Sequence, residues 1–141
     1  MATKADFTLE EWKTLRYAMV DTLTYLSVVQ PGFIDMLREA GSVGLFIAEE
    51  TKDGANQLTR DLALDVHDSR DRDLTVNPAN IETPTLERLA AAAGLLTEKA
   101  PEDLGAFRTF ILGIAETVAE AAGGVSPAEM HAIEKVRAAL G

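Results

Sequence analysis

The chain has no cysteine and only two histidines among its 141 residues. The absence of cysteine excludes disulfides, thiolate zinc sites, iron–sulfur clusters and a cysteine nucleophile, and the scarcity of histidine excludes a histidine-rich metal centre. No stretch approaches the roughly 20 consecutive apolar residues of a membrane span, and the opening residues lack the apolar segment of a secretory signal. We therefore expect a cytoplasmic protein that is not inserted in a membrane.

Basic residues are also scarce, with 13 Lys and Arg against 23 Asp and Glu, which gives a net charge of -10. Nucleic-acid binding draws its affinity from Lys and Arg side chains that displace counterions from phosphates. The charge therefore argues against nucleic acids and anionic membranes as partners. The simplest interpretation of the acidic surplus is solubility. Phosphate-binding glycine motifs are absent as well, so nucleotide binding has no support.

Apolar residues recur every three or four positions along most of the chain, and no region alternates with the period of a strand. This spacing predicts an all-α fold, a compact bundle of about six helices forming a single domain over residues 1–141. The expected helices lie at about residues 9–30, 33–51 and 55–67, and begin near residues 83, 101 and 127. A long irregular connection at about 68–83 separates the third helix from the fourth.

Two of these helices begin with the same motif, a Ser or Thr followed three residues later by Glu. Thr8 with Glu11, and Ser126 with Glu129, fit the capping box, in which the hydroxyl and the carboxylate each accept a backbone N–H at the helix start. The positions expected to face the core are Leu9, Trp12, Leu15, Met19, Leu23 and Leu26 in the first helix and Met130, Ile133, Val136 and Leu140 in the last. The shared motif predicts two equivalent helix starts near the ends of the chain.

The connection at about 68–83 has the approximate spacing of a calcium loop. Counting from Asp71 as position 1 places Asp73 at position 3 and Glu82 at position 12, three oxygen ligands between two predicted helices. Position 6 is Val76, whereas the sharp turn of such a loop requires glycine there. We predict Asp71, Asp73 and Glu82 as metal ligands, with a solvated charged loop that binds no metal as the alternative. The charged front half of this connection is expected to be mobile.

The other titratable groups form no catalytic set. His67 ends a predicted helix among several Asp residues, and His131 is expected to face water. Neither histidine has a Glu three residues before it, as a carboxylate di-metal bundle requires. Glu116 and Glu120 lie one helical turn apart, a spacing that suits an exposed acidic face as well as a chelate. The sequence therefore predicts a protein that is not an enzyme.

The last third of the chain, KAPEDLGAFRTFILGIAETVAEAAGGVSPAEMHAIEKVRAALG, resembles the TerB-like tellurite-resistance family of small all-helical bacterial proteins. The front, FTLEEWKTLRYAMVDTLTYLSVVQPG, looks like the N-terminal part of the same family. The resemblance implies a compact bundle with an internal pseudo-repeat. Members of the family often carry an Asp before the turn glycine that has been proposed to hold a divalent metal, whereas this chain has Ala122–Gly124 and Gln30–Gly32 at the two places.

Two functions follow from the residues and the resemblance together. The first is a non-enzymatic TerB-like interaction module that binds a protein partner, in a bacterial stress response. The second is a divalent-metal-binding helical domain that uses the acidic loop near Asp71. A small enzyme in an acidic bundle is a third alternative. Apart from a divalent cation no cofactor is expected, and a homo-oligomer is left open.

Overall fold

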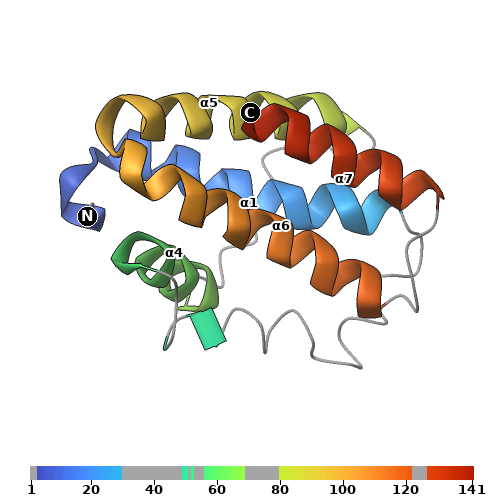
Figure 1. Ribbon diagram of the computed structural model, residues 1–141, viewed down its shortest axis with the longest axis horizontal. Coiled ribbons are helices and arrows are strands. Elements are labelled where there is room, and N and C mark those ends of the chain that lie inside the picture. Colours follow the sequence, from blue (N-terminus) through green and yellow to red (C-terminus); the bar gives the residue numbers. More distant parts are fainter. Residues whose placement is uncertain (1–2, 30–48, 51, 53–55, 69–79, 122–126) are drawn as a thin grey trace.

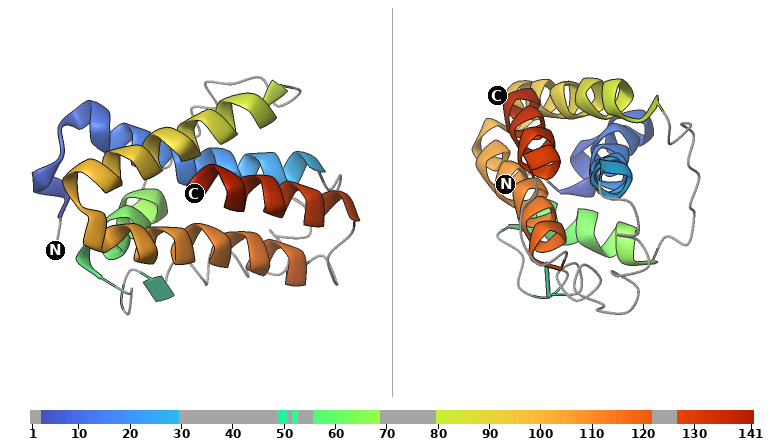
Figure 2. Two further views of the ribbon diagram at one scale, coloured as in Figure 1. Left: turned by 45° about the horizontal axis from the view of Figure 1, so that its top comes forward. Right: turned by 90° about the vertical axis from the view of Figure 1, so that its right-hand side faces the viewer.

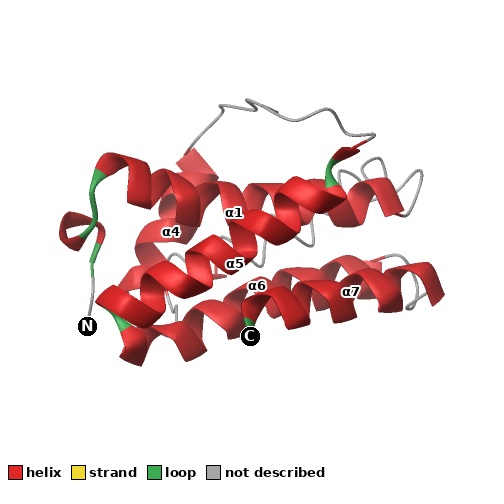
Figure 3. Cartoon of the chain, turned by 90° about the horizontal axis from the view of Figure 1, so that it is seen from above, coloured by secondary structure: helices red, strands yellow, loops and turns green. Residues whose placement is uncertain are grey.

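The computed structural model describes residues 3–29, 49–50, 52, 56–68, 80–121 and 127–141, and every regular element in these ranges is a helix (Figure 3). The predicted all-α class is therefore confirmed. The elements are the 3-10 helix η1 (Lys4–Asp6), α1 (Leu9–Val29), α4 (Gln57–Asp68), α5 (Glu82–Lys99), the 3-10 helix η3 (Pro101–Asp103), α6 (Leu104–Ala121) and α7 (Pro127–Leu140). Most of the helix expected at about 33–51, and most of the connection at about 68–83, lie outside the described residues.

Helix α1 lies at the centre of the arrangement and contacts α4, α5, α6 and α7 (Figure 1). In the right-hand view of Figure 2, α5 lies above α1, α6 and α7 lie to one side of it and α4 lies below it. The most extensive interface joins α1 to α5, and α7 covers α5 and α6 beside it. The first and last described α-helices of the chain are therefore neighbours.

Helix α1 starts as the capping box predicts. The Thr8 N–H donates to Glu11 Oε1 at 2.8 Å, and the Glu11 N–H donates to Thr8 Oγ1 at 3.2 Å. These two bonds satisfy amides that have no partner inside the helix. At the other predicted box, Ser126 and the side chain of Glu129 lie outside the described residues, but α7 does begin at Pro127 as expected.

Phe7, which precedes the first box, takes the core position that we expected for Leu9. Leu9 is 69% exposed, whereas Phe7 is 9% exposed and its ring centroid lies 6.0 Å from that of Trp12. Apolar residues at these two positions, before the cap and four after it, form a hydrophobic staple that fixes the direction of the chain as it enters the helix. The expectation for Leu9 is wrong because this staple covers the core from outside the helix.

Met130 is the second misplaced core residue, since it is 54% exposed. It lies in the first turn of α7, and the apolar face of that helix becomes buried only from Ala132 onward. Helical periodicity cannot show where along a helix its packing begins. The remaining described members of the two stripes are buried or partly buried, as expected.

The starts of α4 and α6 are joined by one polar contact. Asn56 caps α4, because its Oδ1 accepts the Thr59 N–H at 3.0 Å, and its Nδ2 donates to Asp103 Oδ1 at 2.7 Å. Asp103 lies in η3, the 3-10 turn at Pro101–Asp103 that leads into α6, and is 1% exposed. The helix expected to begin at Pro101 therefore begins with a 3-10 turn before α6 continues from Leu104.

The core is formed by one cluster of apolar side chains from all the described α-helices. Its largest fully buried members are Phe107, Leu15, Met19, Leu26, Leu58, Leu62, Leu89, Leu96, Ile111, Ile114 and Leu140. The burial of these side chains supplies the main stabilisation of the fold.

Two residues of the expected α1 stripe test this arrangement. Leu15→Ala should lower the free energy of unfolding by about 2–5 kcal/mol, because it removes a fully buried side chain from the central helix. Leu9→Ala, the same change at an exposed position of the same helix, should stay within about 0.5 kcal/mol of the parent. Urea denaturation of both variants measures the difference, and equal losses would contradict the placement of Leu9 outside the core.

Candidate functional site

Of the three predicted metal ligands, only Glu82 lies in the described part of the chain. Asp71 and Asp73 lie outside it, so the grouping of the three stays a prediction. Glu82 is the first residue of α5, and its carboxylate faces side chains from two other helices, Tyr25 of α1 and Lys135 of α7.

The Tyr25 hydroxyl donates to Glu82 Oε1 at 3.1 Å, and the Lys135 ammonium forms an ion pair with the same oxygen. Tyr25 is only 5% exposed, whereas the side chains of Glu82 and Lys135 are 46% and 41% exposed. The cluster therefore has a buried phenol at its base and an ion pair open to solvent above it. Through one carboxylate oxygen it joins α1, α5 and α7.

The charges in this cluster fix its protonation. The hydrogen bonds from Lys135 and then Tyr25 hold the pKa of Glu82 below its ordinary value, with a smaller contribution from the charge of His131. Burial, and then the neighbouring Glu82, raise the pKa of Tyr25 to about 12. At neutral pH the carboxylate is therefore ionised and the phenol keeps its proton, which makes Tyr25 a hydrogen-bond donor rather than a base or a nucleophile.

This geometry bears on the metal hypothesis. The last ligand of a calcium loop binds the ion with both oxygens of a Glu carboxylate. Here Oε1 of Glu82 already accepts hydrogen bonds from the Lys135 ammonium and the Tyr25 hydroxyl. A divalent ion at this residue would have to share the carboxylate with Lys135 or displace it. Among the residues that the structure describes, no three His, Asp or Glu side chains gather as a set that could hold a metal ion.

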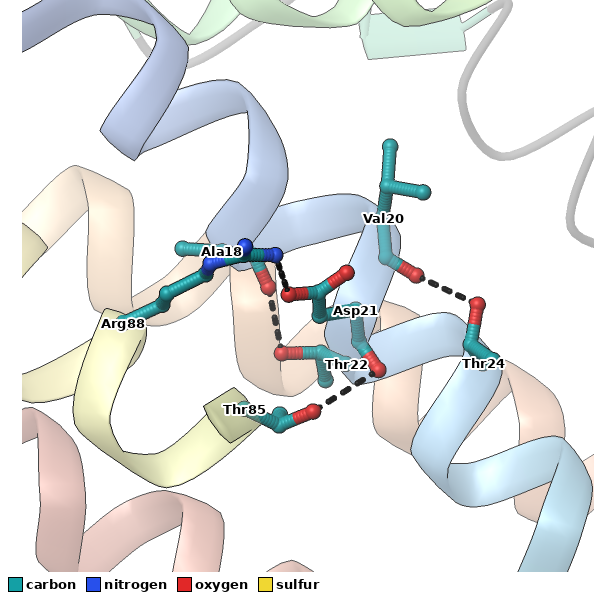
Figure 4. A network of polar contacts seen from close by, with 7 residues as sticks. All are labelled: Ala18, Val20, Asp21, Thr22, Thr24, Thr85 and Arg88. Atoms are coloured by element: carbon teal, nitrogen blue, oxygen red, sulfur yellow. Dashed lines mark hydrogen bonds and ion pairs between the residues drawn. The ribbon is translucent and has the colours of Figure 1, made fainter. Parts of the chain in front are cut away.

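A second polar cluster, between α1 and α5, was not predicted from the sequence (Figure 4). Asp21 is 4% exposed and forms an ion pair with Arg88 of α5, and the Thr85 hydroxyl donates to the Asp21 carbonyl oxygen at 3.3 Å. The Arg88 guanidinium also lies 5.1 Å from the centroid of the Tyr17 ring, which is cation–π distance. Burial raises the pKa of Asp21, and the bond from Arg88 lowers it by a smaller amount.

A signal for Asp21 was present in the sequence. It lies three residues after Ala18 and four before Tyr25, both of them buried, so it falls inside the apolar arc of α1. An acidic residue inside such an arc needs a partner, because burying an isolated charge is costly. The sequence does not indicate that Arg88 is that partner, since this depends on how α5 is aligned on α1.

Among the described residues, the other titratable groups singled out in the sequence form no hydrogen bond or ion pair with these clusters, although the charge of His131 contributes to the lowered pKa of Glu82. His131 is exposed, as expected, and Glu116 is exposed as well. The side chains of His67 and Glu120 lie outside the described residues.

Comparison of the chain with protein-family models, with curated proteins and with solved structures found no match. None of the described helices has the combination of length and apolarity that crossing a membrane requires. In the first cluster the Glu82 carboxylate of α5 binds Tyr25 of α1 and Lys135 of α7, and in the second Asp21 of α1 binds Arg88 of α5. Both sets of contacts fix the positions of these helices relative to one another.

The Glu82 cluster gives a pH-dependent prediction. Because the folded pKa of Glu82 is below the ordinary value of 4.5, its contribution to stability is present above that value and is lost as the pH falls through the folded pKa. Glu82→Gln should therefore lower the free energy of unfolding at pH 7 by about 0.2–1 kcal/mol, as for a solvent-exposed ion pair, with the gap closing below about pH 4.5. Urea denaturation at several pH values measures it. The matched control is Glu87→Gln, an exposed carboxylate on the same helix, and an equal loss in the control would contradict the prediction.

The Asp21 cluster also predicts a loss of stability that shrinks as the pH falls, although here the pKa of the carboxyl is raised and not lowered. Arg88→Met should lower the free energy of unfolding by about 2–4 kcal/mol at pH 7, because it leaves a buried carboxylate without its cation. Loss of Arg88 raises the pKa of Asp21 further, so protonation restores stability as the pH falls toward 4. Denaturation at pH 7 and pH 4 tests this, with Arg137→Met at an exposed position of α7 as the control. A loss of the same size at both pH values would refute the role of Asp21.

Proposed function

We propose that the chain is a non-enzymatic helical module that acts by binding a protein partner. The observation that supports this most directly is that its located polar clusters connect helices to one another. Tyr25, Glu82 and Lys135 join α1, α5 and α7, and Asp21 with Arg88 joins α1 to α5. Groups held in this way keep a fixed protonation state, which suits a rigid surface better than proton transfer.

The charge of the chain indicates the chemistry of such a partner. A protein with a net charge of -10 associates fastest with a surface that carries Lys and Arg, because opposite potentials steer the encounter. Exposed acidic side chains lie on several described helices, among them Glu87 and Glu98 of α5 and Glu134 of α7. We therefore infer that the partner presents a basic surface.

The finer family assignment belongs to the same proposal. We propose that the fold is TerB-like, with six helices, an internal pseudo-repeat and a role in a bacterial stress response. Two findings support a repeat: the Thr8 box opens α1 as its motif predicts, and α7, which follows the second motif, contacts α1. The two helices whose starts carry this motif in the sequence are thus in contact.

Metal binding is the competing function. The observation in its favour is that Glu82, whose pKa is lowered, presents an ionised carboxylate at the start of α5, the helix that follows Asp71 and Asp73 in the chain. Its engagement with Lys135 weighs against it. The two functions differ in whether divalent cations matter for binding.

One experiment separates the two functions. A partner captured from the native cells would be purified and titrated into the parent chain and into the double variant Asp71→Ala with Asp73→Ala, with and without EDTA. We expect the same Kd in all four cases, and weaker binding as salt rises, because screening weakens attraction between exposed charges. Calorimetric titration of both proteins with calcium, magnesium and manganese is the parallel measurement. Binding that needs a divalent cation, together with a heat of metal binding that the double variant lacks, would replace the interaction module with the metal domain.

A further inference from the structure

The N-terminal segment Thr3–Phe7, here called the strap, lies against α4 before the chain enters α1 (Figure 1). It contains η1 and ends at Phe7, which packs on Trp12. Thr3 and Asp6 close the turn, because the Thr3 N–H donates to Asp6 Oδ2 at 2.8 Å. The strap is therefore a structured turn, tied to the first turns of α1 on one side and to α4 on the other.

Lys4 supplies the contacts from the strap to α4. Its backbone N–H donates to Asp61 Oδ2 at 3.2 Å, and its Nζ lies 3.0 Å from Asp65 Oδ2. Asp61 and Asp65 are four residues apart and so lie on the same face of α4. One residue of the strap thus engages two carboxylates along one turn of that helix.

Trp12 of α1 completes this contact. Its indole Nε1–H donates to Asp65, and its ring centroid lies 5.6 Å from Lys4 Nζ. Asp65 therefore receives a donor from the strap and a donor from α1. Trp12 is 3% exposed and is the one tryptophan of the chain. These contacts form a closed set of three side chains from three elements.

Within the described residues, the contact of α4 with α1 is smaller than that of α5 with α1. Helix α4 has 12 residues, and its buried apolar side chains in the described part are Leu58, Leu62 and Ala63. At the other end of α4, Asn56 binds Asp103. The strap thus adds a polar contact to α4 at Asp61 and Asp65, away from the end that Asn56 holds.

We propose that the strap is a latch that sets how often α4 opens from α1 and α6, with the contact of Lys4, Asp65 and Trp12 as its holding point. Opening of one short helix is a local event that leaves the rest of the fold intact. It uncovers Leu58, Leu62 and Trp12, which are apolar surfaces buried in the closed form. Since the latch is held by charge, conditions that screen charge favour opening.

Hydrogen exchange measured by mass spectrometry tests the latch in the whole chain. In Lys4→Ala the amides of α4 should exchange about two- to fivefold faster than in the parent, the range expected when an ion pair of this exposure is removed, while the amides of α5 and α7 keep their rates. The matched control is Lys13→Ala, which makes the same change of charge. Lys13 lies on α1 and pairs with Glu10, 3.8 Å away on the same helix. Its α4 rates should equal those of the parent.

A second variant and a salt arm make the test independent of Lys4→Ala alone. Trp12→Phe keeps an aromatic ring beside Phe7 but removes the indole donor to Asp65, so α4 should again exchange faster. The acceleration of α4 exchange in the double variant should be less than the product of the accelerations in the two single variants, because Lys4 and Trp12 both bind the Asp65 carboxylate. At about 1 M salt, where the screening length is about 3 Å, α4 of the parent should exchange faster and α4 of Lys4→Ala should respond less.

Two results would overturn the latch. If exchange accelerates equally in α4, α5 and α7, the strap stabilises the whole fold and does not control one helix. If α4 keeps its parent rate in both variants and at high salt, the strap does not hold the helix at all. Selective acceleration of α4, absent in Lys13→Ala, supports the proposal.

Discussion

The interface between α1 and α5 is the contact on which the rest of the structure depends, and polar contacts at three places along it set its alignment. Glu11 binds Lys99 at 2.6 Å, Asp21 binds Arg88, and Tyr25 binds Glu82. Residue numbers rise along α1 while those of the partners fall along α5, so the two helices run antiparallel. A sliding of one helix by one turn would break all three contacts, two of them at buried residues of α1. The alignment of the two helices is thus fixed by ion pairs and a hydrogen bond as well as by apolar packing.

Other parts of the fold are built on this aligned pair. Glu82 extends the contact at Tyr25 to Lys135 and so places α7. Glu11 belongs to the capping box at the start of α1 and also forms an ion pair with Lys99, the last residue of α5. The same side chain therefore stabilises the start of α1 and attaches the end of α5 to it. Polar residues of α1 with no partner across an interface are satisfied within the helix, as where the Thr22 hydroxyl donates to the Ala18 carbonyl at 2.7 Å. The buried polar residues Asp21, Thr22, Thr59, Thr85 and Asp103 each have a hydrogen-bond partner, as burial requires, whereas the buried Nε of Arg60 has none among the described residues.

The sequence predicted the local features of this fold and missed those that depend on alignment between helices. The Thr8 box and the period of the apolar residues were sufficient to locate α1, α4, α5 and α7, because capping and periodicity are local properties. Leu9 and Met130 were placed in the core wrongly, since a period does not show where packing begins. Arg88 was missed because its partner lies 67 residues away. Glu82 was singled out as a metal ligand, and the structure explains its carboxylate by contacts with other helices, while the metal loop and the TerB-like assignment stay predictions.

Several of the few basic side chains form ion pairs between elements of the fold. With 13 Lys and Arg against 23 acidic residues, the chain is deficient in cations, yet Lys4, Arg88, Lys99 and Lys135 each bind an acid on a different element. Each of these pairs cancels one acidic charge, so the surplus of acidic over basic residues, and with it the net charge of -10, remains. Arg88, Lys99 and Lys135 act between helices of the central bundle, whereas the cation that holds α4 comes from the strap. Beside its buried apolar side chains and the contact of Asn56 with Asp103, α4 is thus held by a charge from outside the antiparallel pair, which is the physical basis of the proposed latch.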